Sequence, residues 1–260
     1  MSEASQRVYG AMYPSLKDRV VLVTGGGSGI GASILRHFAA QGSKIAFIDI
    51  NRDASEALVA DLEREGRRIR FEKADLTDIG AARAAIERIR AALGPITILV
   101  NNAAHDDRHK LDEITPEYWD DRFAVNLKHQ FFCVQAVYRD MVANGGGAIV
   151  NMGSCSYIMG TENLDAYMSA KSGVIGLTRG LARELGHHNI RVNAILPGWI
   201  MTERQQTLWL DEAGERTMME RQCLKRKIYP DDLARAVLFF ASDEASACTN
   251  QSYIVDGGWV

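Results

Sequence analysis

The sequence predicts a single α/β domain built on a doubly wound parallel sheet, and three observations lead to that prediction. Short runs rich in β-branched residues alternate with longer amphipathic segments, the pattern of strands joined by crossover helices. Several of the runs are apolar nearly throughout, as strands buried on both faces are. The 260 residues, 47% of them hydrophobic, suffice for one large core, and no repeat, low-complexity tract or linker divides them.

Seven runs are predicted to form the strands. In chain order they are 19–25, 44–50, 68–76, 96–103, 147–154, 190–198 and 252–258. The segments between them, such as "GASILRHFAAQG" and "AARAAIERIRAALG", have apolar residues at helical spacing and end in glycine, a common helix terminator. Because crossovers between parallel strands are right-handed, the helices should cover both faces of the sheet.

One segment interrupts this alternation. Residues 199–228 contain no strand-like run and predict two short helices in a flap after the sixth strand. Ligands of such sheets bind at the carboxyl ends of the strands, so we interpret the flap as a lid, with a purely structural insertion as the alternative. Residues 1–15 are interpreted as an N-terminal extension and residues 16–260 as the domain.

Composition and charge argue against several classes of function. The net charge of −3 provides no strong field for nucleic acid or anionic lipid. No apolar run is long enough to span a bilayer, and residues 1–15 lack the apolar core of a signal peptide. The four cysteines are far apart and form no CxxC pair, which is typical of reduced thiols. We therefore expect a cytoplasmic protein that binds neither nucleic acid nor membrane.

The first strand leads into a glycine-rich turn, "TGGGSGIG" at 24–31. Glycines there let the backbone approach a pyrophosphate, which the free N–H groups at the start of the next helix can bind. Asp49 ends the second strand, where a carboxylate accepts hydrogen bonds from ribose hydroxyls and repels a 2′-phosphate; a strand-end cap is the alternative role. We therefore expect NAD, although Arg52 nearby leaves use of NADP open.

Further motifs complete a resemblance to the short-chain dehydrogenase/reductase family that extends from Val20 to about Gly258. They are "TGGGSGIG", "DL" at 75–76, "NNAA" at 101–104, Asn126, Ser154, "YMSAK" at 167–171 and "PGWIMT" at 197–202. The family has glycine where Ala104 stands, so this chain adds a methyl group beside the expected cofactor path. The resemblance implies a single-domain Rossmann fold with a seven-stranded parallel sheet, and a homo-oligomer, most often a dimer or tetramer.

The resemblance also assigns two sets of site residues, and it implies no metal. The catalytic set is Asn126, Ser154, Tyr167 and Lys171. The cofactor-binding set is Gly25, Ser28, Gly29, Ile30, Gly31, Asp49, Ile50, Asp75, Leu76, Asn102, Ala103, Ala104, Tyr167, Lys171, Pro197, Gly198, Ile200 and Thr202.

The catalytic set can also be argued from its chemistry. Tyr167 and Lys171 are four residues apart, so on a helix they share a face at roughly 5–6 Å. A lysine charge favours the phenolate and lowers its pKa from about 10, so we expect Tyr167 to act as a general base near neutral pH. Ser154 is expected to hold the substrate oxygen. Asn126 is expected to keep a helix open to a water that completes a proton relay to Lys171.

The loop "HDDRH" at 105–109 begins where the fourth strand ends, at the edge where cofactor and substrate meet. A metal site would use His105, Asp106 and His109, but no HExxH pattern or cysteine partner supports one. A solvated loop is the second alternative. We favour a pocket wall that recognises hydroxyl groups. The substrate-binding candidates are His105, Asp106, Arg108, Ser154, Ser156, Asn163, Tyr167, Trp199 and Gln205. Cys155 has no histidine placed as its base, so it is interpreted as a small pocket-lining residue.

A closer resemblance within the family points to a substrate. "YPSLKDRVVLVTGGGSGIG", "NNAAHDDRHKL", "FFCVQAV", "QCLKRKIYP" and "DGGW" are similar to the bacterial NAD-dependent sugar 1-dehydrogenases of the D-xylose dehydrogenase type. This implies oxidation of the anomeric carbon of an aldose, such as D-xylose, L-arabinose, D-galactose or L-fucose, to the lactone, by a homotetramer. The alternatives are a ketone or 3-oxoacyl reductase of the same family and a non-catalytic NAD(H) sensor.

Overall fold

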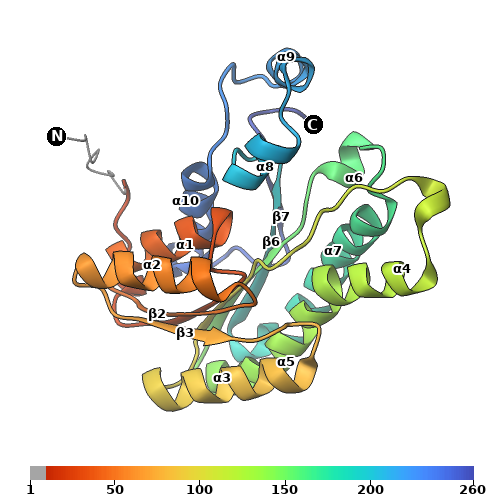
Figure 1. Cartoon of the computed structure of the whole chain (residues 1–260). Coiled ribbons are helices and arrows are strands. Elements are labelled where there is room, and N and C mark those ends of the chain that lie inside the picture. The colour runs from red at the N-terminus through yellow and green to blue at the C-terminus, as the bar shows by residue number, and fades with distance from the viewer. Residues whose placement is uncertain (1–9) are drawn as a thin grey trace.

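The structure, a computed structural model, describes residues 10–260, in which seven parallel strands form one sheet in the order β3-β2-β1-β4-β5-β6-β7 (Figure 1). The strands are β1 (Val20–Thr24), β2 (Lys44–Asp49), β3 (Ile69–Lys73), β4 (Ile98–Asn101), β5 (Gly147–Met152), β6 (Ile190–Pro197) and β7 (Ser252–Val255). Each of the seven predicted runs contains one of these strands. The predicted fold class is therefore confirmed.

Helices cover both faces of the sheet (Figure 1). One face carries α1 (Gly29–Ala40), α2 (Arg52–Arg64) and α10 (Pro230–Ala241), and the other carries α3 (Ile79–Leu93), α5 (His129–Ala143) and α7 (Asp165–Leu185). The shorter α-helices are α4 (Pro116–Phe123), α6 (Ser156–Met159), α8 (Glu203–Leu208) and α9 (Glu212–Arg221). A π-helix spans Ala124–Lys128, and 3-10 turns span Pro14–Leu16, Leu111–Glu113, Gly186–His188 and Asp243–Ala245.

The position of β1 inside the sheet explains why its sequence is apolar nearly throughout. Val21 and Val23 belong to the apolar layer under α1 and α10. Val20 and Leu22 belong to the layer on the opposite face, under α3 and α5. Because successive side chains of a strand enter opposite layers, a strand covered on both faces has no polar side. Truncation of the fully buried Leu22 to alanine would cost about 2–5 kcal/mol of stability.

The end of the predicted N-terminal extension contacts the domain. Tyr13 packs against the core on the α1 side. Leu16, the first residue of the predicted domain, is fully buried. The Tyr13 N–H donates to Gln41 Oε1 at 2.7 Å. Residues 1–9 of the extension lie outside the described residues.

The flap after β6 contains two short helices, α8 and α9, as the sequence predicts. Its two ends meet, since Ile200 and Ile228 form a parallel bridge and the Met201 N–H donates to the Ile228 carbonyl at 2.8 Å. The returning segment of the flap also contacts the C-terminal residues, where the Leu224 N–H donates to the Gly257 carbonyl at 2.9 Å. The flap is thus anchored at its base, beside the carboxyl ends of the central strands (Figure 1).

Two further observations concern the described chain as a whole. No helix in residues 10–260 is long and apolar enough to cross a membrane. All four cysteines are free thiols: Cys133, Cys155, Cys223 and Cys248.

Candidate active site

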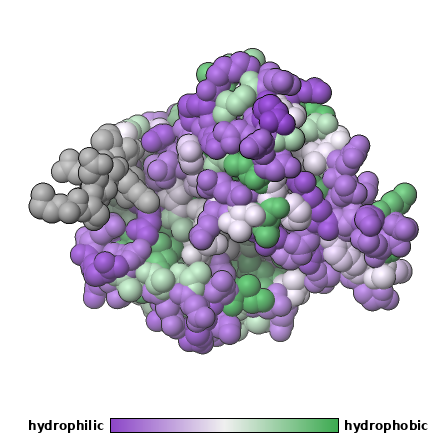
Figure 2. Space-filling model, turned by 45° about the horizontal axis from the view of Figure 1, so that its top comes forward, coloured by the Kyte–Doolittle hydropathy of each residue, from purple (hydrophilic) through white to green (hydrophobic). Residues whose placement is uncertain are grey.

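A cleft of about 1310 Å³ lies at the carboxyl ends of the strands, where the strand order reverses between β1 and β4. Its walls are the glycine turn before α1, the loop after β4, the segment after β5 and the flap. Figure 2 turns the flap side of the molecule forward and shows that hydrophilic residues predominate there, with smaller hydrophobic patches between them. Every residue predicted for the catalytic, cofactor or substrate sets lines this cleft except Asn126 and Asn163.

The glycine turn brings backbone close to backbone. Gly25 has φ +67°, and a Cβ there would lie 2.7 Å from the Ala103 Cα. A Cβ on Gly31 would lie 2.0 Å from the Gly25 carbonyl oxygen, so only glycine fits. The side chain of Ser28, which precedes α1, makes no capping hydrogen bond. The first N–H groups of α1 therefore stay available, with the positive end of the helix dipole, for an anion such as a pyrophosphate.

Asp49 is held rigidly at the end of β2. Its Oδ2 accepts from the Gly27 N–H and its Oδ1 from the Asn51 N–H, both at 2.8 Å. Arg52 pairs with Glu56 at 3.0 Å instead of with Asp49. The turn and this carboxylate fit a nicotinamide dinucleotide, in which Gly25, Gly29 and Gly31 would lie along the pyrophosphate and Asp49 beside the adenosine ribose.

Three of the predicted catalytic residues come together at the base of the cleft. Lys171 Nζ lies 5.7 Å from the centre of the Tyr167 ring, and both residues are on α7. Lys171 Nζ donates to the Met152 carbonyl at the end of β5, at 2.8 Å. Ser154 hydrogen-bonds to the Tyr167 hydroxyl, and its Oγ accepts from the Ser156 N–H at 3.1 Å. This arrangement suits proton transfer between Tyr167 and a substrate oxygen held by Ser154.

The pKa of Tyr167 differs from the sequence-based expectation. Burial and the negative charge of Asp106 raise it above the usual value, while the hydrogen bond with Ser154 works in the opposite direction. Burial also lowers the pKa of Lys171 from 10.5 to about 7, although the negative charge of Asp106 acts to raise it. The amine therefore carries only part of its charge near neutral pH. In the chain without cofactor, desolvation is therefore the largest influence on the pKa of both Tyr167 and Lys171.

Asn126 lies behind the cleft instead of in its wall. It is fully buried within the π-helix, a local widening of the helix at the position where Asn126 was expected to keep a helix open. Its side chain forms a reciprocal pair of hydrogen bonds with the backbone of His105, donating to the carbonyl at 3.0 Å and accepting from the N–H at 2.9 Å. Its own carbonyl accepts from Gln130 Nε2 at 3.2 Å. Asn126 thus holds the start of the 105–109 loop.

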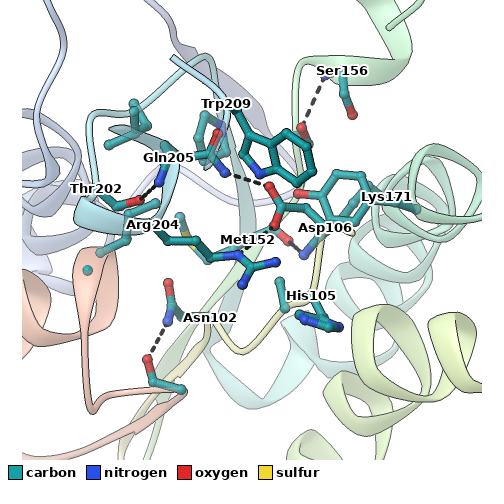
Figure 3. Close-up of a pocket in the computed structure, with 18 of the residues that line it drawn as sticks. Asn102, His105, Asp106, Met152, Ser156, Lys171, Thr202, Arg204, Gln205 and Trp209 are labelled. Carbon is teal, nitrogen blue, oxygen red and sulfur yellow. Dashed lines mark hydrogen bonds and ion pairs between the residues drawn. The ribbon is translucent and has the colours of Figure 1, made fainter. Parts of the chain in front are cut away.

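The 105–109 loop contacts the flap across the cleft (Figure 3). Gln205 Nε2 donates to Asp106 Oδ2 at 2.6 Å. Arg204 donates to Asp106 Oδ1 at 3.3 Å and to Asp107 Oδ1 at 2.5 Å. The sequence did not single out Arg204, because nothing in a helical insertion shows which of its charges will meet a loop nearly a hundred positions earlier.

Two tryptophans extend these contacts. Trp199 Nε1 donates to Gln205 Oε1 at 3.0 Å, which turns the amide nitrogen of Gln205 towards Asp106. The Arg108 guanidinium lies 4.5 Å from the centre of the Trp209 ring, within the range of a cation–π contact. Trp209 lines the cleft and was missed from the sequence. Its position as a large aromatic residue in a polar flap was the available signal.

The two histidines of the 105–109 loop, His105 and His109, lie in different surroundings. The His105 ring contacts Arg122 and Asp107, and burial and the Arg122 charge lower its pKa. His109 is buried against Tyr118, with ring centres 5.2 Å apart, and its backbone N–H donates to the Asn163 carbonyl at 3.0 Å. The Asn163 carbonyl therefore supports the loop, while Asn163 does not line the cleft, and its role in substrate binding stays a prediction. Within residues 10–260 no group of three or more His, Cys, Asp or Glu side chains is placed to hold a metal ion.

Cys155 is a core residue, which corrects its interpretation as pocket-lining. It is fully buried, packs with Ala194 and Leu196, and is absent from the cleft wall. Its Sγ donates to the Leu196 carbonyl at 3.3 Å. Burial raises the pKa of its thiol to about 12, so it is not a nucleophile at neutral pH.

Comparison with known proteins agrees with this geometry. The family model described as enoyl-(acyl carrier protein) reductase matches residues 25–260. A probable galactose dehydrogenase from Rhizobium meliloti (strain 1021) is 50% identical over 249 residues, which cover 95% of this chain and 97% of the relative. The chain belongs to the short-chain dehydrogenase/reductase family.

A second relative of this short-chain dehydrogenase is D-xylose 1-dehydrogenase from Caulobacter vibrioides (strain NA1000 / CB15N). It is 47% identical over 249 residues, which cover 96% of this chain and 98% of the relative. Among solved structures, a blue fluorescent protein from a metagenomic library, in complex with NADPH, superposes with a TM-score of 0.88 and is 35% identical in sequence. The match covers 95% of this chain and 99% of the blue fluorescent protein. The chain is therefore an oxidoreductase of a family that uses nicotinamide dinucleotides.

Proposed function

We propose that this short-chain dehydrogenase oxidises the anomeric carbon of an aldose to the lactone with NAD. The candidate substrates are D-xylose, L-arabinose, D-galactose and L-fucose. The observation that carries the proposal is the Asp106 carboxylate, which Gln205 holds in the cleft near enough to Tyr167 to affect its pKa. A fixed carboxylate recognises hydroxyl groups by directed hydrogen bonds and disfavours analogues that lack them. The relatives named as galactose and D-xylose dehydrogenases support a sugar as the substrate.

The side chains have distinct roles in this reaction. Ser154 holds the anomeric oxygen, and Tyr167 takes the proton of the anomeric hydroxyl as the general base. Bound NAD supplies the hydride acceptor and a positive charge beside Tyr167. Lys171 receives protons from Tyr167, and Asn126 completes the relay through its widened helix. The pair of electrons in the anomeric C–H bond leaves as hydride, so the sugar becomes the lactone.

Several observations support the finer parts of the proposal. Asp49 favours NAD, because a 2′-phosphate beside its carboxylate would be repelled, and Arg52 is paired with Glu56. Four free cysteines suit a cytoplasmic protein. A homotetramer follows from the family resemblance, and size-exclusion chromatography with light scattering tests it.

The test is formation of NADH by the purified protein with NAD and a panel of aldoses and simple secondary alcohols. We expect turnover on one group of sugars and its loss in Tyr167→Phe, while NADH binding is retained. Lactone formation is checked by trapping the product with hydroxylamine. Turnover of the simple alcohols alone, or unchanged turnover in Tyr167→Phe, would refute the proposal.

The description of the matched family model favours a second candidate, a reductase of acyl or ketone substrates. The charged loop separates the two. Replacement of Asp106 and Arg108 by alanine should damage turnover of sugars and spare turnover of acyl substrates, which have no hydroxyl groups for this loop to bind. Sugar kinetics that are indifferent to both changes would favour the reductase.

A further inference from the structure

Two buried polar atoms in the cleft wall have no hydrogen-bond partner within residues 10–260. They are Ser156 Oγ, on the segment after β5, and Trp209 Nε1, on the flap. A buried N–H without an acceptor is costly, and nearly all such groups in proteins are paired. The indole N–H is only a donor, so a ligand in the cleft that pairs with it must bring an acceptor atom.

The Trp209 indole is held in place from several sides. Its backbone N–H donates to the Gln205 carbonyl at 3.1 Å, at the end of α8. The Arg108 guanidinium covers the ring at 4.5 Å from its centre. Gln205 itself is tied to Asp106, so the indole and the carboxylate belong to one connected wall, drawn together in Figure 3. A donor held this way is positioned before any ligand arrives, which lowers the entropic cost of binding.

The chemistry of this wall selects for a particular kind of ligand. Asp106 can only accept hydrogen bonds when ionised, whereas the Trp209 N–H can only donate one. A hydroxyl group both donates and accepts, so a ring that carries several hydroxyls can satisfy both residues. A ketone or thioester oxygen could accept from Trp209 but could donate no hydrogen bond to Asp106.

We infer that Trp209 is a specificity-determining residue whose indole N–H donates to one hydroxyl oxygen of the aldose, while Asp106 and Ser156 bind its other hydroxyls. This inference rests on the proposed function. Trp209→Phe is the sharpest variant, because it keeps an aromatic ring for Arg108 and removes only the N–H and part of the ring. Trp119→Phe is the matched control, since Trp119 lies on α4 and does not line the cleft.

The experiment compares kcat/KM of the wild-type and variant enzymes on the best aldose and on its monodeoxy analogues. Loss of one neutral hydrogen bond should lower kcat/KM of Trp209→Phe about three- to tenfold on the parent sugar. For the one analogue that lacks the partner hydroxyl, the two enzymes should differ less than about twofold, as expected for a removed pairwise interaction. Trp119→Phe should match the wild type on every sugar.

The outcomes separate this inference from the proposed function. If the wild-type enzyme turns over no aldose, the proposed function fails and the inference fails with it. If the wild-type enzyme is active and Trp209→Phe is unchanged, or loses the same factor on every analogue, Trp209 has no paired hydroxyl and the inference alone is overturned. Thermal melting and NADH binding of Trp209→Phe verify that the fold and the cofactor site are intact.

Discussion

Gln205, on the flap, donates its side-chain amide to the carboxylate of Asp106, on the loop after β4, at 2.6 Å. The amide cannot be turned around, because Trp199 Nε1 donates to its oxygen at 3.0 Å. The position of the flap and the orientation of the carboxylate are therefore coupled. A change at either residue should alter sugar binding more than it alters cofactor binding.

Asp106→Asn tests the carboxylate. The substitution keeps the size of the side chain but removes the charge and sets one amide N–H group against the amide of Gln205. Loss of a charge-assisted hydrogen bond should raise KM for the aldose about 10- to 100-fold, with NADH affinity within about twofold of the wild type. Asp107→Asn is the control, since Asp107 does not line the cleft. Equal changes of KM in both variants would contradict a direct role for Asp106.

Asp49→Ser tests the choice of cofactor. Removal of the carboxylate relieves repulsion of a 2′-phosphate and weakens the hydrogen bonds to the ribose hydroxyls. The ratio of kcat/KM for NADP to that for NAD should rise by about tenfold or more. Asp53→Ser serves as the control, because Asp53 is in the first turn of α2 and outside the cleft wall. An unchanged ratio in Asp49→Ser would show that Asp49 acts only as a strand-end cap.

The buried amine of Lys171 predicts a pH dependence of stability. Its pKa falls from 10.5 in the unfolded chain to about 7 in the fold, so between these values the unfolded state binds more protons and stability rises with pH. From about pH 7 to pH 9 this group alone should add about 2 kcal/mol to the free energy of unfolding. Urea unfolding of the cofactor-free protein measures it. The free energy of unfolding of the wild type minus that of Lys171→Met should rise by this amount from about pH 7 to pH 9. Parallel curves of the two proteins against pH would refute the shift.

The thiols should differ in reactivity. Burial raises the pKa of Cys133 and of Cys155 to about 12, while Cys223 is exposed. A disulfide reagent at neutral pH should label Cys223 rapidly and these two buried cysteines only after denaturation, because the thiolate is the reactive form. Mass spectrometry of the labelled peptides gives the order. Rapid labelling of Cys155 in the folded protein would revive a nucleophilic role for it.

The strands and the cofactor turn could be predicted because their signals are local. The apolar runs around Val20–Thr24 reflect burial on both faces of one strand, and the glycine turn reflects backbone contacts within a few residues. The i, i+4 spacing of Tyr167 and Lys171 likewise survives into the structure, since both lie on one helix. The opened helix at Asn126 was expected as part of the catalytic set, because the residues around it carry no local signal for a π-helix.

The electrostatics of the site depended on burial, which sequence spacing does not report. Tyr167 and Lys171 share a helix face as predicted, yet burial and the charge of Asp106 raise the pKa of Tyr167 in the chain without cofactor. Asn163 was expected to bind substrate, but it does not line the cleft, and its carbonyl accepts from the backbone N–H of His109 at 3.0 Å. In both cases the outcome depends on which neighbours surround the side chain in three dimensions.

The amino-acid sequence alone was enough for the fold class, the glycine turn with Asp49, and the residues that match the catalytic set of the family. These depend on side-chain periodicity and on contacts close in the chain, which the order of residues encodes directly. The tertiary structure alone decided that Arg204, Gln205 and Trp209 meet the loop at Asp106 and Arg108. Such contacts form only after the sheet brings the ends of β4 and β6 to one edge, because a side chain's partner is then set by packing and not by its position in the chain.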